Sequence, residues 1–303
     1  MDLPRQRPRH IGEATPAEPG RPAEEALPLL LERLAGPDHQ VREAALRELV
    51  ALADVHSGAR GRVVPAVCAY LRSPWAAERG RAVPTGEPEL RRTALGLLTE
   101  RLRDPQAPTS WCGYDVDLAG AVLAGADFSG CWFTDGRVRL EGAWAIEGRL
   151  AFDGARFDGA RVSLRHWSDG QGEVSFRGAR FSAGVVSLAG AVLHTGVLCA
   201  AGASVDGGAL VFTEARLDGG TIDLSRVTVS AGLLSFSDAH LRSGRLLLEG
   251  ARITGGVTAL RNVRTAPGVL VTEGAMVRPG TVDVDGAVEV AGADGRRREH
   301  ASS

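Results

Sequence analysis

The side chains most capable of chemistry in this sequence are carboxylates and histidines that lie close together near the middle of the chain. Asp153, Asp158 and Asp169 stand near His166 and Trp167. Two carboxylates that converge in a cleft could act as a general acid and a general base. Asp169, however, replaces an apolar residue of the repeat described below, and a bulge or loop that takes polar residues out of the core explains this more simply. We favour that structural interpretation.

Residues typical of other reaction classes form no recognisable motif. His194 and His240 stand at corner positions of the repeat and are expected to be solvated. No Ser-His-Asp order and no phosphate-binding loop is present. The cysteines include no CxxC pair and have no histidine at metal-ligand spacing; they are Cys68, Cys112, Cys131 and Cys199. We therefore expect a protein that is not an enzyme, with no catalytic, cofactor-binding or metal site.

The composition of the chain indicates a globular and repetitive protein. Hydrophobic residues make up 44% of the 303 residues, which is enough for a sizeable core. The 39 glycines and an aromatic content of 5% suggest a turn-rich repeat. A net charge of -2 implies no strong nucleic-acid-binding surface. Since no apolar segment could serve as a signal peptide or a membrane span, we expect a cytoplasmic protein with reduced cysteines.

A twelve-residue period occupies most of the second half of the chain. In the segment FTEARLDGGTIDLS, apolar or small residues recur at fixed places: Phe212, Ala215, Leu217, Gly220, Ile222 and Leu224. The leading residue of each unit is apolar, at positions 152, 164, 176, 188, 200, 212, 224, 236, 248 and 260. Alternate residues of a strand face the same way, so Gly220, Ile222 and Leu224 are predicted to point inward together, as are Ala215 and Leu217. The residue pairs between these sets are predicted to form corners.

The spacing within each unit selects one kind of β-solenoid. Two hexapeptides would also repeat every twelve residues, as in the left-handed β-helix of acyltransferases, but here the sub-spacing is five plus seven. One unit cannot close around phenylalanine side chains. We therefore expect two units, 24 residues, in each turn of a right-handed parallel β-helix with a rectangular cross-section and about seven turns. This β-helix is predicted over residues 111–292.

The preceding part of the chain has the periodicity of helices. Apolar residues at helical spacing, such as Leu27, Leu30 and Leu34, predict an α-helical domain over residues 23–110. Its helices are expected within 23–36, 38–55, 61–73 and 88–104. Residues 1–22 cannot bury apolar surface and are expected to be a disordered tail, as are residues 293–303. The predicted fold class is α+β, an α-helical domain followed by a β-helix.

Both parts of the chain resemble known families. LERLAGPDHQVREAALRELVALA resembles a HEAT repeat, in which two helices pack as a hairpin around a Pro-Asp turn. DLAGAVLAGADFSGCWFTD has an apolar residue at every fifth place and resembles the pentapeptide-repeat family, whose unit is roughly A-(D/N)-L-x-x. With VCAYLRSP and ELRRTALGLLTERLRD before it, this pattern is similar to actinobacterial pentapeptide-repeat proteins, in which helices precede and cap the β-helix. A few members of the family protect DNA gyrase from inhibitors by mimicking duplex DNA with an acidic rod, and most have no assigned activity.

The distribution of charge argues against DNA mimicry. Residues 111–303 hold 22 acidic and 19 basic side chains, a net charge of -3. Duplex DNA presents one negative charge per ~1.7 Å of axis, so a rod about 33 Å long would need roughly twenty. We expect instead a protein-interaction or scaffold module whose partner is another protein or a second copy of the chain, with no direct contact to nucleic acid. A factor that protects DNA gyrase or another topoisomerase is the alternative function.

One outward face of the predicted β-helix is apolar. The ninth and eleventh positions of every second unit point outward and stack on one side of a 24-residue turn. The residues predicted to form a partner-binding surface there are Val185, Ala209, Val211, Leu233, Val257 and Ala259. A contiguous apolar stripe usually marks a contact surface, although β-branched residues also suit a strand in itself. Arginines at the fourth position, such as Arg156, Arg180 and Arg216, stand near carboxylates and are expected to form a solvated, charge-mixed face.

Overall fold

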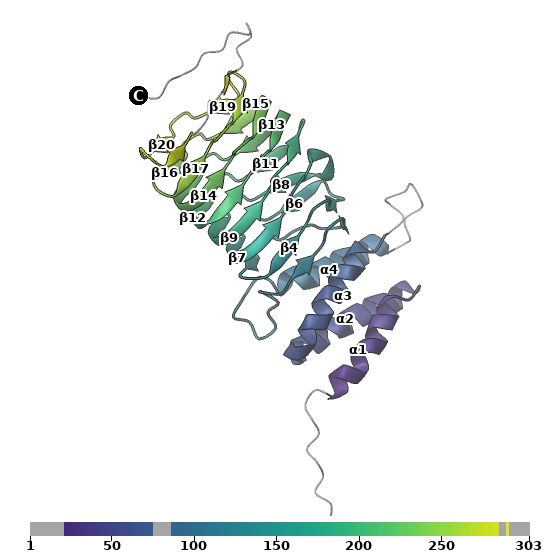
Figure 1. The fold of residues 1–303 in the computed structure, drawn as a ribbon. Coiled ribbons are helices and arrows are strands. Elements are labelled where there is room, and N and C mark those ends of the chain that lie inside the picture. The colour runs from purple at the N-terminus through teal and green to yellow at the C-terminus, as the bar shows by residue number, and fades with distance from the viewer. Residues whose placement is uncertain (1–20, 75–85, 285–288, 291–303) are drawn as a thin grey trace, which may run out of the picture.

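The computed structural model describes residues 21–74, 86–284 and 289–290, and in these it places four α-helices before a parallel β-solenoid of about seven turns (Figure 1). The α+β architecture expected from the sequence is therefore confirmed. The predicted tails, residues 1–22 and 293–303, lie outside the described residues, except that Arg21 and Pro22 open the first helix.

The helical region consists of α1 Arg21–Leu34, α2 His39–Val55, α3 Arg60–Arg72 and α4 Glu87–Glu100, with a short 3-10 helix, η1 Ser57–Ala59, before α3. α1 and α2 pack on each other as a hairpin. The carboxylate of Asp38 accepts hydrogen bonds from the backbone amides of Gln40 and Val41, at 2.8 and 3.0 Å. These amides have no partner within the helix, so an aspartate before the first turn fixes where α2 begins.

The solenoid consists of short parallel strands in two large sheets and one small one. The 11-stranded sheet contains β1 Val116–Asp117, β3 Trp132–Phe133, β4 Arg137–Arg139, β7 Arg156–Ser163, β9 Arg180–Ser187, β12 Ser204–Val211, β14 Thr228–Ser235, β16 Arg252–Ile253, β17 Val257–Ala259, β20 Met276–Val277 and β21 Val282–Asp283. The 9-stranded sheet contains β6 Arg149–Ala151, β8 Glu173–Ser175, β10 Val192–Leu193, β11 Val197–Cys199, β13 Arg216–Asp223, β15 His240–Leu247, β18 Arg264–Thr265, β19 Leu270–Val271 and β22 Glu289–Val290. β2 Val122–Leu123 and β5 Trp144–Ala145 form the small sheet.

The pairing register confirms a turn of 24 residues. Ser204 of β12 lies beside Thr228 of β14, whereas the first turn is two residues shorter, since Val116 lies beside Val138. Register shifts interrupt the long strands, so one turn has four segments in regular register, for example 204–205, 209–211, 216–217 and 221–223. This outline agrees with the rectangular cross-section that the five-plus-seven spacing predicts.

Stacks of phenylalanine rings fill the inside of the early turns. One stack follows Phe128, Phe152 and Phe176, whose ring centroids are 5.1 and 5.0 Å apart. A second follows Phe133, Phe157 and Phe181, at 5.1 and 4.9 Å, and all six rings are at most 2% exposed. The ring spacing is close to the ~4.8 Å between hydrogen-bonded strands, so backbone pairing and ring stacking reinforce each other.

The helical region covers the N-terminal end of the solenoid (Figure 1). The backbone amide of Trp132 donates to the carbonyl of Leu102, at 2.6 Å, and the buried guanidinium of Arg60 donates to the carbonyl of Ser110, at 3.1 Å. Buried Trp111 belongs to one hydrophobic core that runs from the helices into the solenoid. The helices therefore cover the core and the strand edges of the first turn, which a solenoid without them would expose to water.

Glycine at the eighth position of a unit lets adjacent turns approach closely. At Gly244 the backbone φ is 85°, and a Cβ atom would stand only 2.1 Å from the carbonyl oxygen of Gly220 in the preceding turn. A side chain is thus opposed both by the left-handed backbone and by the neighbouring turn. Gly178 also has a positive φ, 61°, but nothing lies within 4 Å of the Cβ atom it could carry.

We predict that Phe212→Asp strongly destabilises the solenoid. Phe212 is fully buried and its ring stacks on Phe236 with centroids 4.8 Å apart, so the variant would bury an unpaired charge at a cost of several kcal/mol. Phe212→Leu is the control, since it keeps an apolar side chain and should lose less. A circular-dichroism melt of Phe212→Asp that matches the wild-type melt would contradict the register of the core.

A second prediction separates steric contact between turns from backbone strain. Gly178→Ala should cost about 1 kcal/mol, the usual penalty of a left-handed backbone with a side chain. Gly244→Ala should cost clearly more, because its methyl group must also displace the Gly220 carbonyl. Urea unfolding of the two variants measures the difference, and equal losses would show that adjacent turns are not packed so tightly at this position.

Candidate functional site

The predicted partner-binding residues lie on consecutive turns of the 11-stranded sheet. Val185 of β9 pairs with Ala209 of β12, Ala209 with Leu233 of β14, and Leu233 with Val257 of β17. We call these four residues the outer row. Val211 pairs with Ser187 and with Ser235, and Ser235 pairs with Ala259, which gives a parallel inner row of Ser187, Val211, Ser235 and Ala259. The structure thus brings all six predicted residues together.

The two rows differ in their exposure to solvent. In the outer row Val185 is 37% and Val257 43% exposed, and the two residues between them are half-buried. In the inner row Val211 is half-buried, whereas Ser235 and Ala259 are buried, with 5% and 8% exposure. The inner row immediately precedes a corner, where Ser235 hydrogen-bonds the hydroxyl of Ser237, at 3.3 Å. The apolar surface is therefore one projecting row beside a shallower one.

Both rows end in charged residues. On the N-terminal side the outer row continues into Arg161 and then Arg137, which are exposed and paired by register. Neither guanidinium makes an ion pair with a residue in the described part of the chain. On the C-terminal side the inner row continues from Ala259 to Asp283, whose carboxylate lies 2.8 Å from Nε of Arg261. The outer row therefore begins after two exposed arginines, and the inner row continues into the Arg261–Asp283 ion pair.

The arginines at the fourth position of the repeat occur on both sheets and interact with their surroundings. The Arg180 guanidinium lies 2.8 Å from the Asp206 carboxylate, and that of Arg216 lies 3.5 Å from Asp218. Arg156 stacks over the ring of Trp132, at 4.4 Å from its centroid. Exposed ion pairs of this kind contribute little to stability. The expected charge-mixed surface is present at these positions.

The three carboxylates considered for acid–base chemistry do not converge. Asp153 is hydrogen-bonded by the Ser175 hydroxyl, and Asp158 accepts from the Ser182 hydroxyl at 2.7 Å. Asp169 instead begins a short 3-10 helix, η3 Asp169–Gln171, that interrupts the strand pattern. Asp153 is thus bound at β8 of the 9-stranded sheet and Asp158 at β9 of the 11-stranded sheet, so these two carboxylates interact with different sheets.

Asp169 substitutes for a stretch of strand pairing. One of its oxygens accepts the backbone amides of His194, Thr195 and Gly196 at 2.7, 2.6 and 2.8 Å, and the other lies 3.2 Å from Nδ1 of His194. Its side chain is only 8% exposed. Burial by itself raises the pKa of this carboxyl, but the hydrogen bonds from Thr195, Gly196 and His194 outweigh it and hold the pKa well below its ordinary value. Asp169 is therefore a structural anion that satisfies three amides of the next turn.

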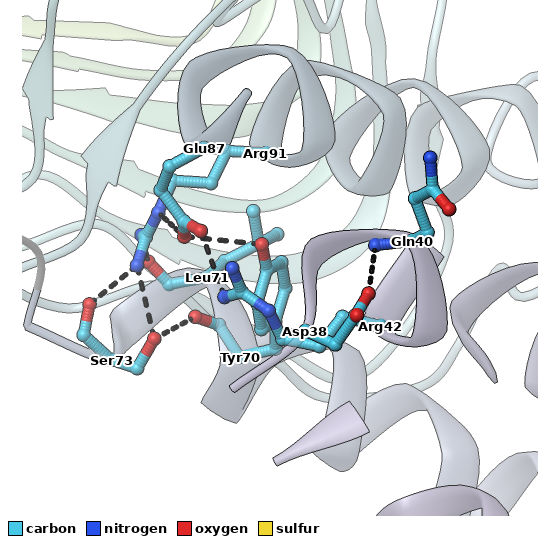
Figure 2. Close-up of polar contacts among 8 residues, drawn as sticks. All are labelled: Asp38, Gln40, Arg42, Tyr70, Leu71, Ser73, Glu87 and Arg91. Atoms are coloured by element: carbon cyan, nitrogen blue, oxygen red, sulfur yellow. Dashed lines mark hydrogen bonds and ion pairs between the residues drawn. The ribbon is translucent and has the colours of Figure 1, made fainter. Parts of the chain in front are cut away.

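A buried charge cluster in the helical region is not evident from the sequence analysis (Figure 2). The Glu87 carboxylate lies 2.9 Å from Nε of Arg91 and 2.8 Å from the guanidinium of Arg42, and Tyr70 donates to it at 3.1 Å. Burial, followed by the negative charge of Glu87, raises the pKa of Tyr70. Arg91 also donates to the backbone carbonyl of Ser73, at 2.6 Å. The cluster ties α2, α3 and α4 together, and the i, i+4 spacing of Glu87 and Arg91 is the sequence signal that could have indicated it.

The cysteines have the properties of core residues. All four are free thiols, and Cys68, Cys131 and Cys199 are buried. Burial raises the pKa of Cys68 to about 11 and that of Cys131 to about 12, so both stay protonated near neutral pH. No group of three or more histidine, cysteine or acidic residues within the described ranges is arranged to hold a metal ion.

We predict that Asp169→Asn destabilises the solenoid by about 2 kcal/mol at neutral pH, because a neutral amide is a weaker acceptor for three backbone amides. The folded-state pKa of Asp169 is lowered, so the stability from its carboxylate is fully present above pH ~4 and is lost as the pH falls below that value. Wild type should therefore lose more stability than Asp169→Asn between about pH 6 and pH 3. Urea unfolding over this range measures the difference, with Asp158→Asn as a control that should behave as wild type.

None of the helices that the structure describes is both long and apolar enough to cross a membrane. A comparison of the chain with protein-family models, with curated proteins and with solved structures finds no match. The fold and its surfaces are therefore the ground on which a function can be inferred.

Proposed function

We propose that this chain is a non-enzymatic protein-interaction module of the pentapeptide-repeat type, which acts in the cytoplasm and binds another protein molecule through the apolar face of its 11-stranded sheet. The observation that carries this proposal is the outer row, in which Val185, Ala209, Leu233 and Val257 stack on four consecutive turns. Four free cysteines fit a reducing compartment.

The physical argument for binding is the cost of leaving this row in water. A soluble protein keeps isolated apolar side chains on its surface without penalty to function, but a contiguous row is less common and marks contact surfaces. Because the solenoid is held by turn-to-turn hydrogen bonds and a packed core, the row is a rigid platform. A partner that docks there orders few side chains of this chain, so the loss of side-chain entropy on binding is small.

The alternative of a gyrase-protecting DNA mimic has less support. A mimic needs a face that presents carboxylates in succession. The exposed positions of the 11-stranded sheet instead include Arg137, Arg156, Arg161 and Arg180. A supercoiling assay with gyrase and a quinolone, with and without the protein, tests this alternative directly, and protection would favour it over our proposal.

We predict that the double variant Val211→Lys/Leu233→Lys folds as wild type but loses its partner. Both residues are half-buried on the outer side of the sheet, where a lysine stem can lie along the surface with its charge in water. Docking would then have to desolvate two charges, which should weaken binding more than tenfold. Affinity capture from the native host, together with light scattering of the purified chain, measures the association.

A matched control places the same changes on the 9-stranded sheet. Val197 and Thr221 pair there on adjacent turns and are 36% exposed and half-buried, respectively. Val197→Lys/Thr221→Lys should keep every wild-type association. If the Val211→Lys/Leu233→Lys variant keeps its circular-dichroism spectrum, its mass and all wild-type partners, the apolar row serves only strand formation and the proposal is wrong.

A further inference from the structure

We propose that the apolar face binds an amphipathic α-helix of a partner protein, which lies along the axis of the solenoid. Apolar residues of this helix contact the outer row, and carboxylates at one end of the same stripe contact Arg161 and Arg137. The inference rests on the proposed function, since it uses the same surface, and it states the chemistry of the partner. Charge, spacing and backbone hydrogen bonding on this face all favour such a helix.

Two arginines without a counter-charge continue the outer row on its N-terminal side. Arg137 and Arg161 are exposed and are paired directly by register, and Arg161 is paired in turn with Val185. Like charges on directly paired residues repel each other. Neither guanidinium forms an ion pair with a residue in the ranges that the structure describes. Carboxylates supplied by a partner would relieve this repulsion.

A second pair of stacked arginines on the same sheet has partners within the chain. Arg156 of β7 is paired by register with Arg180 of β9. The Arg180 guanidinium lies 2.8 Å from the Asp206 carboxylate, and that of Arg156 lies over the Trp132 ring, 4.4 Å from its centroid. Of these two arginine pairs, the one without a local counter-charge is therefore the one in line with the apolar row.

The spacing of the row fits a helix better than an extended chain. β4, β7, β9, β12, β14 and β17 follow one another along the solenoid (Figure 1), and each contributes one residue to the row from Arg137 to Val257. At ~4.8 Å per turn the row is about 24 Å long. Six residues on one side of a helix, three or four positions apart, span about 26 Å. Six residues on one face of an extended strand would span about 33 Å.

The hydrogen bonding of the strands also favours a helix. β9, β12 and β14 are each paired with strands on both sides. An extended peptide laid on this face would therefore gain no strand pairing from them, whereas a helix satisfies its own backbone. A helix about 10 Å across also covers the inner row, which stands two residues from the outer row and includes half-buried Val211.

Synthetic helical peptides test the chemistry of the partner. The first peptide, of about 20 residues, carries two glutamates and then four leucines on one side of the helix, three or four positions apart. The second has lysines in place of the two glutamates. Fluorescence anisotropy of each labelled peptide, titrated with the full chain, measures the dissociation constants. We expect the acidic peptide to bind about tenfold or more tightly than the basic one, and the difference to shrink at high salt.

Charge reversal on the protein tests where the carboxylates bind. The variant Arg137→Glu/Arg161→Glu should prefer the basic peptide. Arg242 and Arg245 are exposed residues of β15 in the 9-stranded sheet, so Arg242→Glu/Arg245→Glu changes the net charge equally and should keep the preference for the acidic peptide. Circular dichroism checks that both variants are folded. Equal binding of the two peptides by the wild-type chain, or an unchanged preference in Arg137→Glu/Arg161→Glu, would overturn the inference.

Two further measurements separate this inference from the proposed function. Val211→Lys/Leu233→Lys should bind the acidic peptide at least tenfold more weakly than the wild-type chain, and an unchanged affinity would show that the peptide does not lie on the row. Failure of the acidic peptide to bind the wild-type chain overturns the inference, whereas the proposed function fails only if Val211→Lys/Leu233→Lys keeps every wild-type partner. A duplex oligonucleotide that binds the wild-type chain more tightly than the acidic peptide, and is lost in Arg137→Glu/Arg161→Glu, would assign the arginines to nucleic acid and overturn the inference.

Discussion

Each turn of the solenoid must place its side chains directly over those of the turn before, because parallel backbone pairing holds adjacent strands ~4.8 Å apart over the whole length. An inward residue therefore meets the residue 24 places earlier, and a stack is stable only when both have compatible shapes. Phe152 on Phe128 and Phe157 on Phe133 satisfy this condition with nearly parallel rings, at 14° and 9°. The same condition gives Gly244 its place over the carbonyl of Gly220, where no side chain fits.

The periodic constraint also explains how the fold tolerates its irregular unit. Around Asp169 the chain leaves the strand pattern, and amides of the next turn lose the carbonyl partners that a regular turn would supply. The carboxylate of Asp169 takes three of these amides, at His194, Thr195 and Gly196. Unpaired buried amides are costly, so a carboxylate in this loop preserves the stacking of the turns on either side. Asp169, one of the three carboxylates considered for acid–base chemistry, therefore has a structural role in the solenoid.

Outward residues stack on the preceding turn as inward residues do, but they need not fit into a closed core. Their side chains can therefore vary, and a binding surface can form on the outside of the solenoid. The repeat stacks outward residues into rows whatever their side chains are, so the chemistry of a row is free to change along the rod. A single row contains Arg137 and Arg161 and then Val185 to Val257. The helical region at the N-terminal end makes the rod asymmetric (Figure 1). A partner that binds this face would therefore meet a row whose two ends differ and whose residues are one turn, ~4.8 Å, apart.

The sequence alone determined the helical and solenoid halves, the 24-residue turn, the inward residues and the outward apolar rows, because a strict period converts position in the chain into position in space. It could not determine how deeply each outward residue is buried: Ala259 and Val257 are two residues apart, yet they are 8% and 43% exposed. Nor could it reveal the partners of Asp169 in the next turn, or the approach of Arg42 in α2 to the Glu87–Arg91 pair of α4. Those contacts depend on how separate helices and loops pack against one another, and no sequence period relates one of these segments to the next.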